Sequence, residues 1–176
     1  MKEVEVKAKV HDQNMIRTKL QALGCVLSEP IRQHDQVFLT AGMTLDQVSR
    51  GDCILRIRQT DHEIILTLKK QLTNELDNVE LELLITDPIT AKSLIEHLGF
   101  EPVIEIIKTR QTAKYSGMNI CLDTVEGLGD FIEVEKMTDA ADSLAVQDEL
   151  FTWLKTLGIA ETDRILQGYD TLLSKK

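Results

Sequence analysis

The sequence predicts an α+β fold, in which an eight-stranded antiparallel β-barrel has helices packed on its outside. Eight short segments are candidate strands, and several of them alternate between apolar and charged residues, which is typical of half-buried strands. Other segments carry apolar residues at helical spacing between a capping residue and a glycine. The chain of 176 residues is close to the usual size of one domain, so we expect residues 1–176 to form a single domain.

The alternation places charged residues on one face of each candidate strand. In the first strand, Glu3, Glu5 and Lys7 share a face, and apolar residues occupy the other. An open sheet with one solvated face would explain this pattern, but eight strands can also close into a barrel with a small interior. Charged faces turned inward would then line a tunnel. The candidate strands cover residues 2–10, 33–39, 52–60, 63–69, 78–86, 103–115, 118–124 and 130–137.

The ends of the helices are marked by residues that favour helix starts and stops. An aspartate can accept hydrogen bonds from the free N–H groups of the first turn, and a proline suits the first helical position. Glycines follow the apolar stripes of the first two helices and are expected to end them. The four expected helices start at Asp12, at Asp87, at Asp139 or Asp142, and at Asp163, the last one ending at Leu173.

Composition excludes several classes of function. The net charge of −9 argues against a general binder of nucleic acid or of anionic membranes, and no segment reaches the length of a membrane span. The first seven residues lack the apolar core of a signal peptide. The cysteines Cys25, Cys53 and Cys121 are odd in number and far apart, which argues against a disulfide framework or a zinc motif. We therefore expect a cytoplasmic protein.

The charged residues of the strands contain both signs in nearly equal number. Carboxylates beside a cationic cluster are consistent with divalent ions, because Mg²⁺ or Mn²⁺ binds carboxylate, phosphate and water oxygens together. Arginine and lysine would then bind the remaining phosphate oxygens. The pattern predicts a site for a polyphosphate carried with its metal. The cations are Lys7, Arg56, Arg58, Lys69, Lys108 and Arg110, and the anions are Glu3, Glu5, Glu80, Glu82, Asp123, Glu133 and Glu135.

An ordered series of short motifs resembles the CYTH superfamily, the triphosphate tunnel metalloenzymes. It starts with Glu3-x-Glu5-x-Lys7 and spans nearly the whole chain. The later motifs are Leu55-Arg56-Ile57-Arg58, Leu66-Thr67-Leu68-Lys69, Glu80-Leu81-Glu82, Lys108-Thr109-Arg110, Leu122-Asp123, the run from Gly127 to Glu135, and Tyr169-Asp170-Thr171-Leu172-Leu173. The Gly-Leu-Gly-Asp-Phe start of that run and the closing Tyr-x-x-Leu-Leu look most like the class IV adenylyl cyclase (CyaB-type) branch.

The resemblance implies a triphosphate tunnel, dependence on Mg²⁺ or Mn²⁺, and a role for each charged residue. It also makes a homodimer plausible. Glu80 and Glu82 would orient basic side chains or bind a second metal, and Tyr169 would be a supporting core or lid residue. The implied metal ligands are Glu3, Glu5, Asp123, Glu133 and Glu135. The implied triphosphate-binding residues are Lys7, Arg56, Arg58, Lys69, Lys108 and Arg110.

Two reactions fit such a tunnel. In a cyclase, ATP yields cyclic AMP and pyrophosphate; in a hydrolase, water attacks tripolyphosphate, thiamine triphosphate or a nucleoside triphosphate. Either a second metal ion or a lysine of lowered pKa, Lys7 or Lys69, would activate the attacking oxygen. The His-Phe pair that precedes the first motif in bacterial cyclases is absent, so both reactions stay open. A polyphosphate- or nucleotide-binding module without activity and a purely structural domain are the remaining alternatives.

Overall fold

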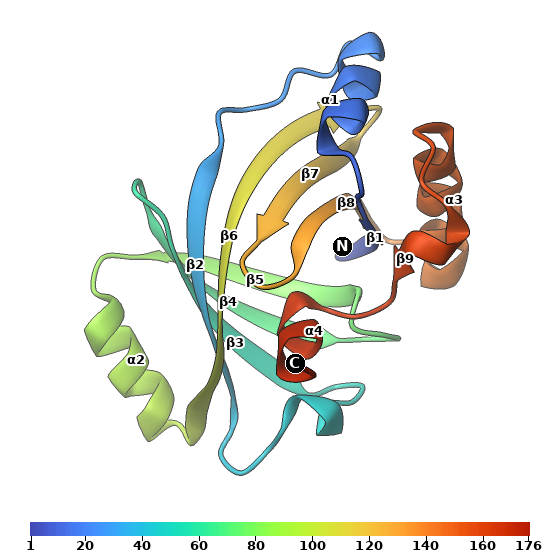
Figure 1. Ribbon diagram of the computed structural model, residues 1–176. Helices are drawn as coiled ribbons and strands as arrows, with labels where there is room; N and C mark the ends of the chain where they lie inside the picture. The colour runs from blue at the N-terminus through green and yellow to red at the C-terminus, as the bar shows by residue number, and fades with distance from the viewer.

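The computed structural model describes all 176 residues and shows a ring of antiparallel strands (Figure 1). Neighbouring strands follow the order β5-β4-β3-β2-β6-β7-β8-β1, and β1 closes the ring by pairing with the start of β5. The predicted α+β class and antiparallel eight-stranded architecture are therefore confirmed. The strands are β1 (Lys2–Lys9), β2 (Ile31–Thr40), β3 (Cys53–Gln59), β4 (Ile64–Gln71), β5 (Asp77–Ile85), β6 (Phe100–Tyr115), β7 (Met118–Val125) and β8 (Gly129–Thr138).

Alternation along β1 separates the two faces of the ring. Val4 and Val6 are buried in the main hydrophobic core, whereas Glu5 and Lys7 face the interior of the ring. In the register between β1 and β8, Val6 lies opposite Val134, so the outer faces of the two strands contribute to the same core. A slip of one residue would move every charged side chain into that core, so the hydrophobic pattern fixes the register.

Two helices cover the outer face of β1, β7 and β8. Ile16 and Leu20 of α1 (Gln13–Ala22) and Leu150 of α3 (Ser143–Thr156) are fully buried in the same cluster as the outward residues of these strands. Ile95 of α2 (Pro88–His97) packs against a second cluster on the outer face of β2, β3 and β4. The prediction of helices outside the strands is correct for these three.

Aspartates cap the three longer helices as predicted. Asp12, Asp87 and Asp142 each accept a hydrogen bond from a backbone N–H in the first turn of α1, α2 and α3. Asp142, and not Asp139, is thus the start signal of the third helix. Pro88 occupies the first helical position of α2, where its missing N–H has no partner to lose.

The last helix is shorter than predicted. We expected it to start at Asp163, but a 3₁₀ turn, η2 (Glu161–Asp163), comes first and is followed by the short strand β9 (Arg164–Ile165). β9 pairs with the second edge of β1, so tertiary pairing takes these residues away from a helix. The helix α4 begins only at Tyr169, after Gly168, and covers Tyr169–Ser174.

The short helix α4 lies at one end of the ring and not on its outer face (Figure 1). Tyr169, Leu172 and Leu173 pack with Val37 and Ile106 in a small apolar cluster inside that end. The helix also contacts the 3₁₀ turn η1 (Leu45–Gln47), in the loop that joins β2 to β3. The chain therefore covers one end of its own tunnel.

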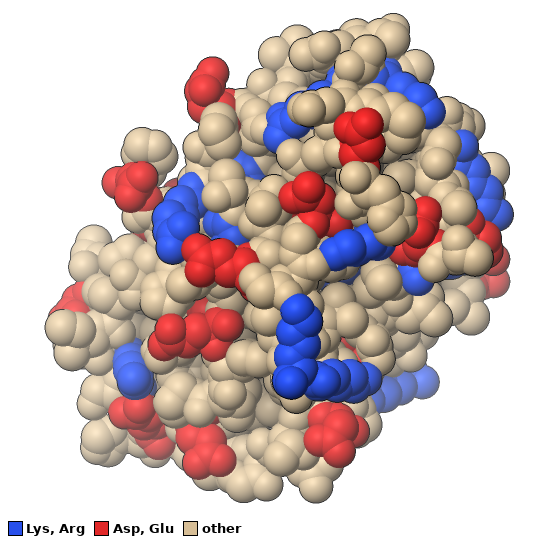
Figure 2. All heavy atoms as spheres, viewed as in Figure 1, with Lys and Arg blue, Asp and Glu red and all other residues tan.

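The outer surface carries charges of both signs. On the face shown in Figure 2, acidic and basic side chains are interspersed, and the basic side chains that adjoin one another form only a short run near the C-terminus. A general nucleic-acid binder presents a basic face to the phosphates, so this face gives no support to such a function. None of the helices has the length and apolar character that a transmembrane helix requires.

The outer core predicts a large difference between two leucines of α3. Leu150 is fully buried and Leu144 is 60% exposed. Leu150→Ala should lower the free energy of unfolding by about 2–5 kcal/mol, because it removes buried methyl groups and leaves a cavity. Leu144→Ala should change it by less than about 0.5 kcal/mol. Urea denaturation of both variants measures this, and an equal loss in the two would contradict the assignment of the core.

Candidate functional site: a charged tunnel

The interior of the ring is a cavity of about 400 Å³ whose lining is mostly polar and charged. All eight strands of the ring and the helix α4 contribute side chains to this lining. Of the residues predicted to form the site, only Asp123 lies outside the lining, immediately behind Arg110. The predicted residues that line the cavity are Glu3, Glu5, Lys7, Arg56, Arg58, Lys69, Glu80, Glu82, Lys108, Arg110, Glu133, Glu135 and Tyr169.

Three carboxylates at one wall lie close together, and the neighbouring cations do not fully neutralise them. One oxygen each of Glu3, Glu5 and Glu135 lies within 4.8 Å of the others. Burial, together with the neighbouring carboxylates, raises the pKa of Glu3 to about 8 and that of Glu5 to about 7. The side chain of Glu3 makes no hydrogen bond or ion pair, and Lys7 lies 3.4 Å from Glu5. Oxygen donors in this arrangement fit a hard divalent cation such as Mg²⁺ or Mn²⁺.

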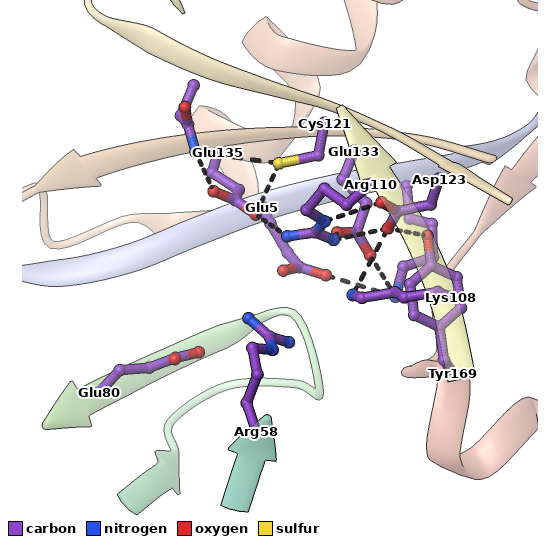
Figure 3. A network of polar contacts seen from close by, with 12 residues as sticks. Glu5, Arg58, Glu80, Lys108, Arg110, Cys121, Asp123, Glu133, Glu135 and Tyr169 are labelled. Carbon is purple, nitrogen blue, oxygen red and sulfur yellow. Dashed lines mark hydrogen bonds and ion pairs between the residues drawn. The ribbon is translucent and has the colours of Figure 1, made fainter. Parts of the chain in front are cut away.

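The neighbouring carboxylates Glu133 and Asp123 are, in contrast, already paired (Figure 3). Arg110 donates from Nε and Nη2 to the two oxygens of Asp123, at 2.7 and 2.6 Å, and also contacts Glu133. Lys7 Nζ lies 3.1 Å from Glu133. Burial would raise the pKa of Glu133, but Arg110 and Lys7 outweigh it and hold that pKa well below its ordinary value. The five predicted metal ligands thus fall into two environments.

The opposite wall contains a second buried pair that the sequence did not indicate. Arg58 donates to both oxygens of Asp35, each at 2.7 Å, and Asp35 is only 1% exposed. Burial alone would raise the pKa of Asp35, but the hydrogen bonds and charge of Arg58 lower it. Asp35 alternates with Gln33 and Val37 on the inward face of β2, and this alternation was the available signal for its position.

Of the two other cations of this wall, Arg56 is held more loosely and Lys69 is closely paired. Arg56 lies 3.5 Å from Glu82 and 3.9 Å from Glu80, and its buried Nε has no hydrogen-bond partner. Lys69 Nζ lies 2.5 Å from Glu80. Glu80 and Glu82 therefore contact basic side chains, as the resemblance implied. An unpaired buried N–H next to a cavity is well placed to bind an anionic oxygen.

The lysines differ in their affinity for a proton. Burial opposes charge on Lys7, but Glu133 and Glu5 outweigh it and raise the pKa of Lys7 above its ordinary value. The lowered pKa that we expected for Lys7 is therefore not found there, whereas burial and the nearby Arg110 reduce the pKa of Lys108 to about 8. An amine with a pKa near neutrality can accept or release a proton under working conditions.

Tyr169 links the end of the tunnel to the charged network. Its hydroxyl donates to Asp123 at 3.0 Å, and its ring lies 4.2 Å from Lys7 Nζ and 5.0 Å from Lys108 Nζ. Burial raises the pKa of Tyr169 well above its ordinary value, so the hydroxyl keeps its proton. The side chain thus contacts one carboxylate and two cations of the site.

Comparison with known proteins matches nearly the whole chain to one family. The profile of the CYTH domain family covers residues 1–169. The chain belongs to the CYTH domain family. The match includes all eight strands of the ring and ends at Tyr169, so it contains every predicted site residue. The recognition made from the ordered motifs is thereby confirmed.

Three similar proteins illustrate the match. A Methanocaldococcus jannaschii protein, provisionally named an adenylate cyclase, is 32% identical and aligns over 96% of this chain and 97% of its own length. The adenylate cyclase CyaB of Aeromonas hydrophila is 27% identical over 97% of this chain and 87% of its own. A conserved protein of Pyrococcus furiosus without an assigned function has a solved structure with a TM-score of 0.80, 27% identity, and coverage of 97% and 99%.

The raised pKa values predict how the metal-free protein responds to pH. Glu3 and Glu5 hold protons more tightly in the folded chain than at their ordinary pKa of 4.5. Stability should therefore fall as the pH rises from about 5 toward 8, because the unfolded chain releases these protons earlier. Thermal unfolding in the presence of a chelator measures this. As the pH rises through this window, the melting temperature of Glu3→Gln should increase relative to that of the unmodified chain. Parallel curves for the two proteins would contradict the assigned environment of Glu3.

The two arginines of the opposite wall should respond differently to removal of their charge. Arg58→Met leaves Asp35 buried without its partner and should cost about 3–5 kcal/mol of unfolding free energy. Arg56→Met should cost far less stability but should weaken binding of tripolyphosphate, since Arg56 has the unpaired N–H. Urea denaturation and calorimetry measure the two effects. As a control, Asp35→Leu combined with Arg58→Met should recover most of the lost stability.

Proposed function

We propose that this protein is a divalent-metal-dependent enzyme that converts ATP to cyclic AMP and pyrophosphate. One observation carries the proposal: a single cavity of about 400 Å³ holds three clustered carboxylates, of which Glu3 has no ion-pair partner, together with a wall of cations. A metal-bound triphosphate has the complementary charges. The names of the two curated relatives, one an adenylate cyclase and one provisionally named as such, support the choice of reaction.

In this proposal Glu3, Glu5 and Glu135 hold the metal ion. A bound divalent ion neutralises the charge of the phosphates and of the leaving pyrophosphate. Arg56 and Lys69 bind phosphate oxygens from the opposite wall, where their contacts with Glu80 and Glu82 hold them in place. Reactions of this kind depend on positioning and charge neutralisation, and not on a covalent nucleophile.

The lysines take separate roles in the same proposal. Lys7, whose pKa is raised, stays protonated and serves to bind phosphate. Lys108 lies beside Tyr169, at the end of the tunnel that α4 covers. Its lowered pKa makes it suited to hold or accept a proton. Arg58 and Arg110 are each clamped by a carboxylate, so they hold the electrostatic field of the tunnel in a fixed direction.

The distribution of apolar residues favours a substrate with an organic group. Val37, Leu45, Val48, Ile54 and Ile106 line the cavity, several of them in the apolar cluster that packs against α4 at one end. Inorganic tripolyphosphate has no apolar group that could pack against such a surface, whereas a nucleobase would bury apolar area against it. We therefore place the nucleoside at this end and the phosphates between the charged walls.

The main competing reaction is hydrolysis of tripolyphosphate or of another triphosphate in the same tunnel. Incubation of the purified protein and Mn²⁺ with ATP, and separately with tripolyphosphate, distinguishes the two. Cyclic AMP and pyrophosphate from ATP are expected. Orthophosphate without any cyclic product would replace the cyclase with a hydrolase, and binding without turnover in any divalent metal would indicate a non-catalytic binding module.

The apolar end predicts a substitution that separates the two kinds of ligand. Val48→Ser should weaken ATP binding about tenfold, because a polar group replaces apolar contact with the base. Binding of tripolyphosphate should stay unchanged. Ile65→Ser is a matched control, since Ile65 lines the cavity next to Arg58, where phosphate is expected. Calorimetry with Ca²⁺, at equal ligand concentrations, measures both; an equal effect of Val48→Ser on the two ligands would exclude a base at this end.

A further inference from the structure

A cysteine thiol faces the tunnel between the carboxylates of β8. Cys121 of β7 is fully buried and lines the cavity, and its Sγ lies 3.5 Å from Oε1 of Glu135 (Figure 3). The sulfur and one oxygen each of Glu133 and Glu135 all lie within 4.8 Å of one another. The site therefore includes a soft sulfur atom among its hard oxygen atoms.

The strand register holds this group together. Cys121 lies directly opposite Glu133 in the pairing of β7 with β8, and Asn119 lies opposite Glu135. Asn119 donates to Glu135 at 2.8 Å, which fixes that carboxylate beside the thiol. The neighbours Ile120 and Leu122 point the other way, into the outer core. Three possible ligands therefore lie on two adjacent strands of rigid backbone, which is favourable for a precise metal site.

The cysteine group adjoins the carboxylate trio that fits magnesium or manganese. Glu135 belongs to both groups, with Glu3 and Glu5 on one side and Cys121 and Glu133 on the other. The trio is an independent sign of cation binding here, because Glu3 has no partner of opposite charge in the protein. The same wall thus offers one oxygen-only set of ligands and one set that includes sulfur.

The distances suit a particular kind of metal. In tetrahedral zinc sites, sulfur and oxygen ligands at typical bond lengths are separated by about 3.6 Å. The observed 3.5 Å between Cys121 Sγ and Glu135 Oε1 is close to that value. Thiolates select zinc and similar soft ions, whereas magnesium prefers oxygen ligands alone. We infer that Cys121, Glu133 and Glu135 form a site for a soft divalent ion such as Zn²⁺ or Cd²⁺ beside the magnesium-type site.

The local charge balance permits this binding. Five carboxylates, those of Glu3, Glu5, Asp123, Glu133 and Glu135, face three cations, those of Lys7, Lys108 and Arg110. When the ion binds, a metal–sulfur bond forms, the S–H bond breaks and the proton leaves to solvent. The wall gains one net positive charge. The ion competes with Arg110, which contacts Glu133 and whose Nη1 lies 3.5 Å from the same oxygen of Glu135. It also competes with Lys7, whose Nζ lies 3.1 Å from Glu133.

A weak hydrogen bond from the thiol to Glu135 is the ordinary explanation of the same contact. It requires nothing beyond the protein, and serine at position 121 would replace it. Cysteine spacing gave no sign of a metal site, because two glutamates of another strand complete the set of ligands. The two explanations differ in whether the sulfur bonds to an added metal, and spectroscopy measures this directly, without any turnover.

The experiment is a titration of the full-length chain with Cd²⁺, following the ultraviolet charge-transfer band of the cadmium–thiolate bond. One equivalent of Cd²⁺ should produce the band. Excess Mg²⁺ should not change the band, and Zn²⁺ should remove it by competing with Cd²⁺. Cys121→Ser should abolish the band. The matched double variant Cys25→Ser with Cys53→Ser keeps Cys121 as its only thiol and should retain the band. Far-ultraviolet circular dichroism checks that each variant is folded.

Two results would overturn the inference. One is absence of the band in the double variant, where Cys121 is the only possible source. The other is a band of full strength in Cys121→Ser, which would place the cadmium on another cysteine. Glu135→Gln should weaken Cd²⁺ binding at least tenfold, and unchanged affinity would remove Glu135 from the site. Because the readout is a metal–sulfur bond, these results do not depend on whether the proposed cyclase reaction occurs.

Discussion

Ionised side chains inside a protein are costly unless each meets a partner of opposite charge, and the ring satisfies this requirement across neighbouring strands. Asp35 lies directly opposite Arg58, and Lys69 lies opposite Glu80. Arg110 faces Asp123, and Lys7 faces Glu133, in the same direct way. The ion pairs therefore form only in the observed strand register, and they in turn stabilise that register. A shift of one strand would both expose its apolar face and separate its ion pairs.

One cross-strand pair breaks this pattern, and it marks the site. Glu5 lies directly opposite Glu135, so two like charges face each other, whereas the other directly opposed pairs of charged residues are complementary. Such a pair is unfavourable in an antiparallel sheet unless something else supplies positive charge. Glu3, two residues away on the same face, adds a third carboxylate. The site is thus a local deficiency of positive charge in a wall that is otherwise balanced.

The sequence predicted the elements well because their signals are local. Alternation along each strand and an aspartate before each longer helix depend only on neighbours in the chain. The sequence did not reveal which charges pair, because pairing depends on register. Asp35 was missed as the partner of Arg58, and the lowered pKa of Lys108 depends on burial beside Arg110. The end of the chain was mispredicted because β9 and α4 owe their positions to contacts with distant strands.

The short helix α4 connects the packing of the chain to the electrostatics of the tunnel. Its first residue, Tyr169, donates to Asp123 and lies against Lys7 and Lys108, while the Lys7 ammonium also donates to the carbonyl of Gln167 at 3.1 Å. Without this segment, Asp123 would lose a neutral partner and the two lysines would gain contact with water. Water would screen their charges, and burial would no longer favour the neutral amine of Lys108. The helix that covers the end of the tunnel is therefore also a condition for the charge states inside it.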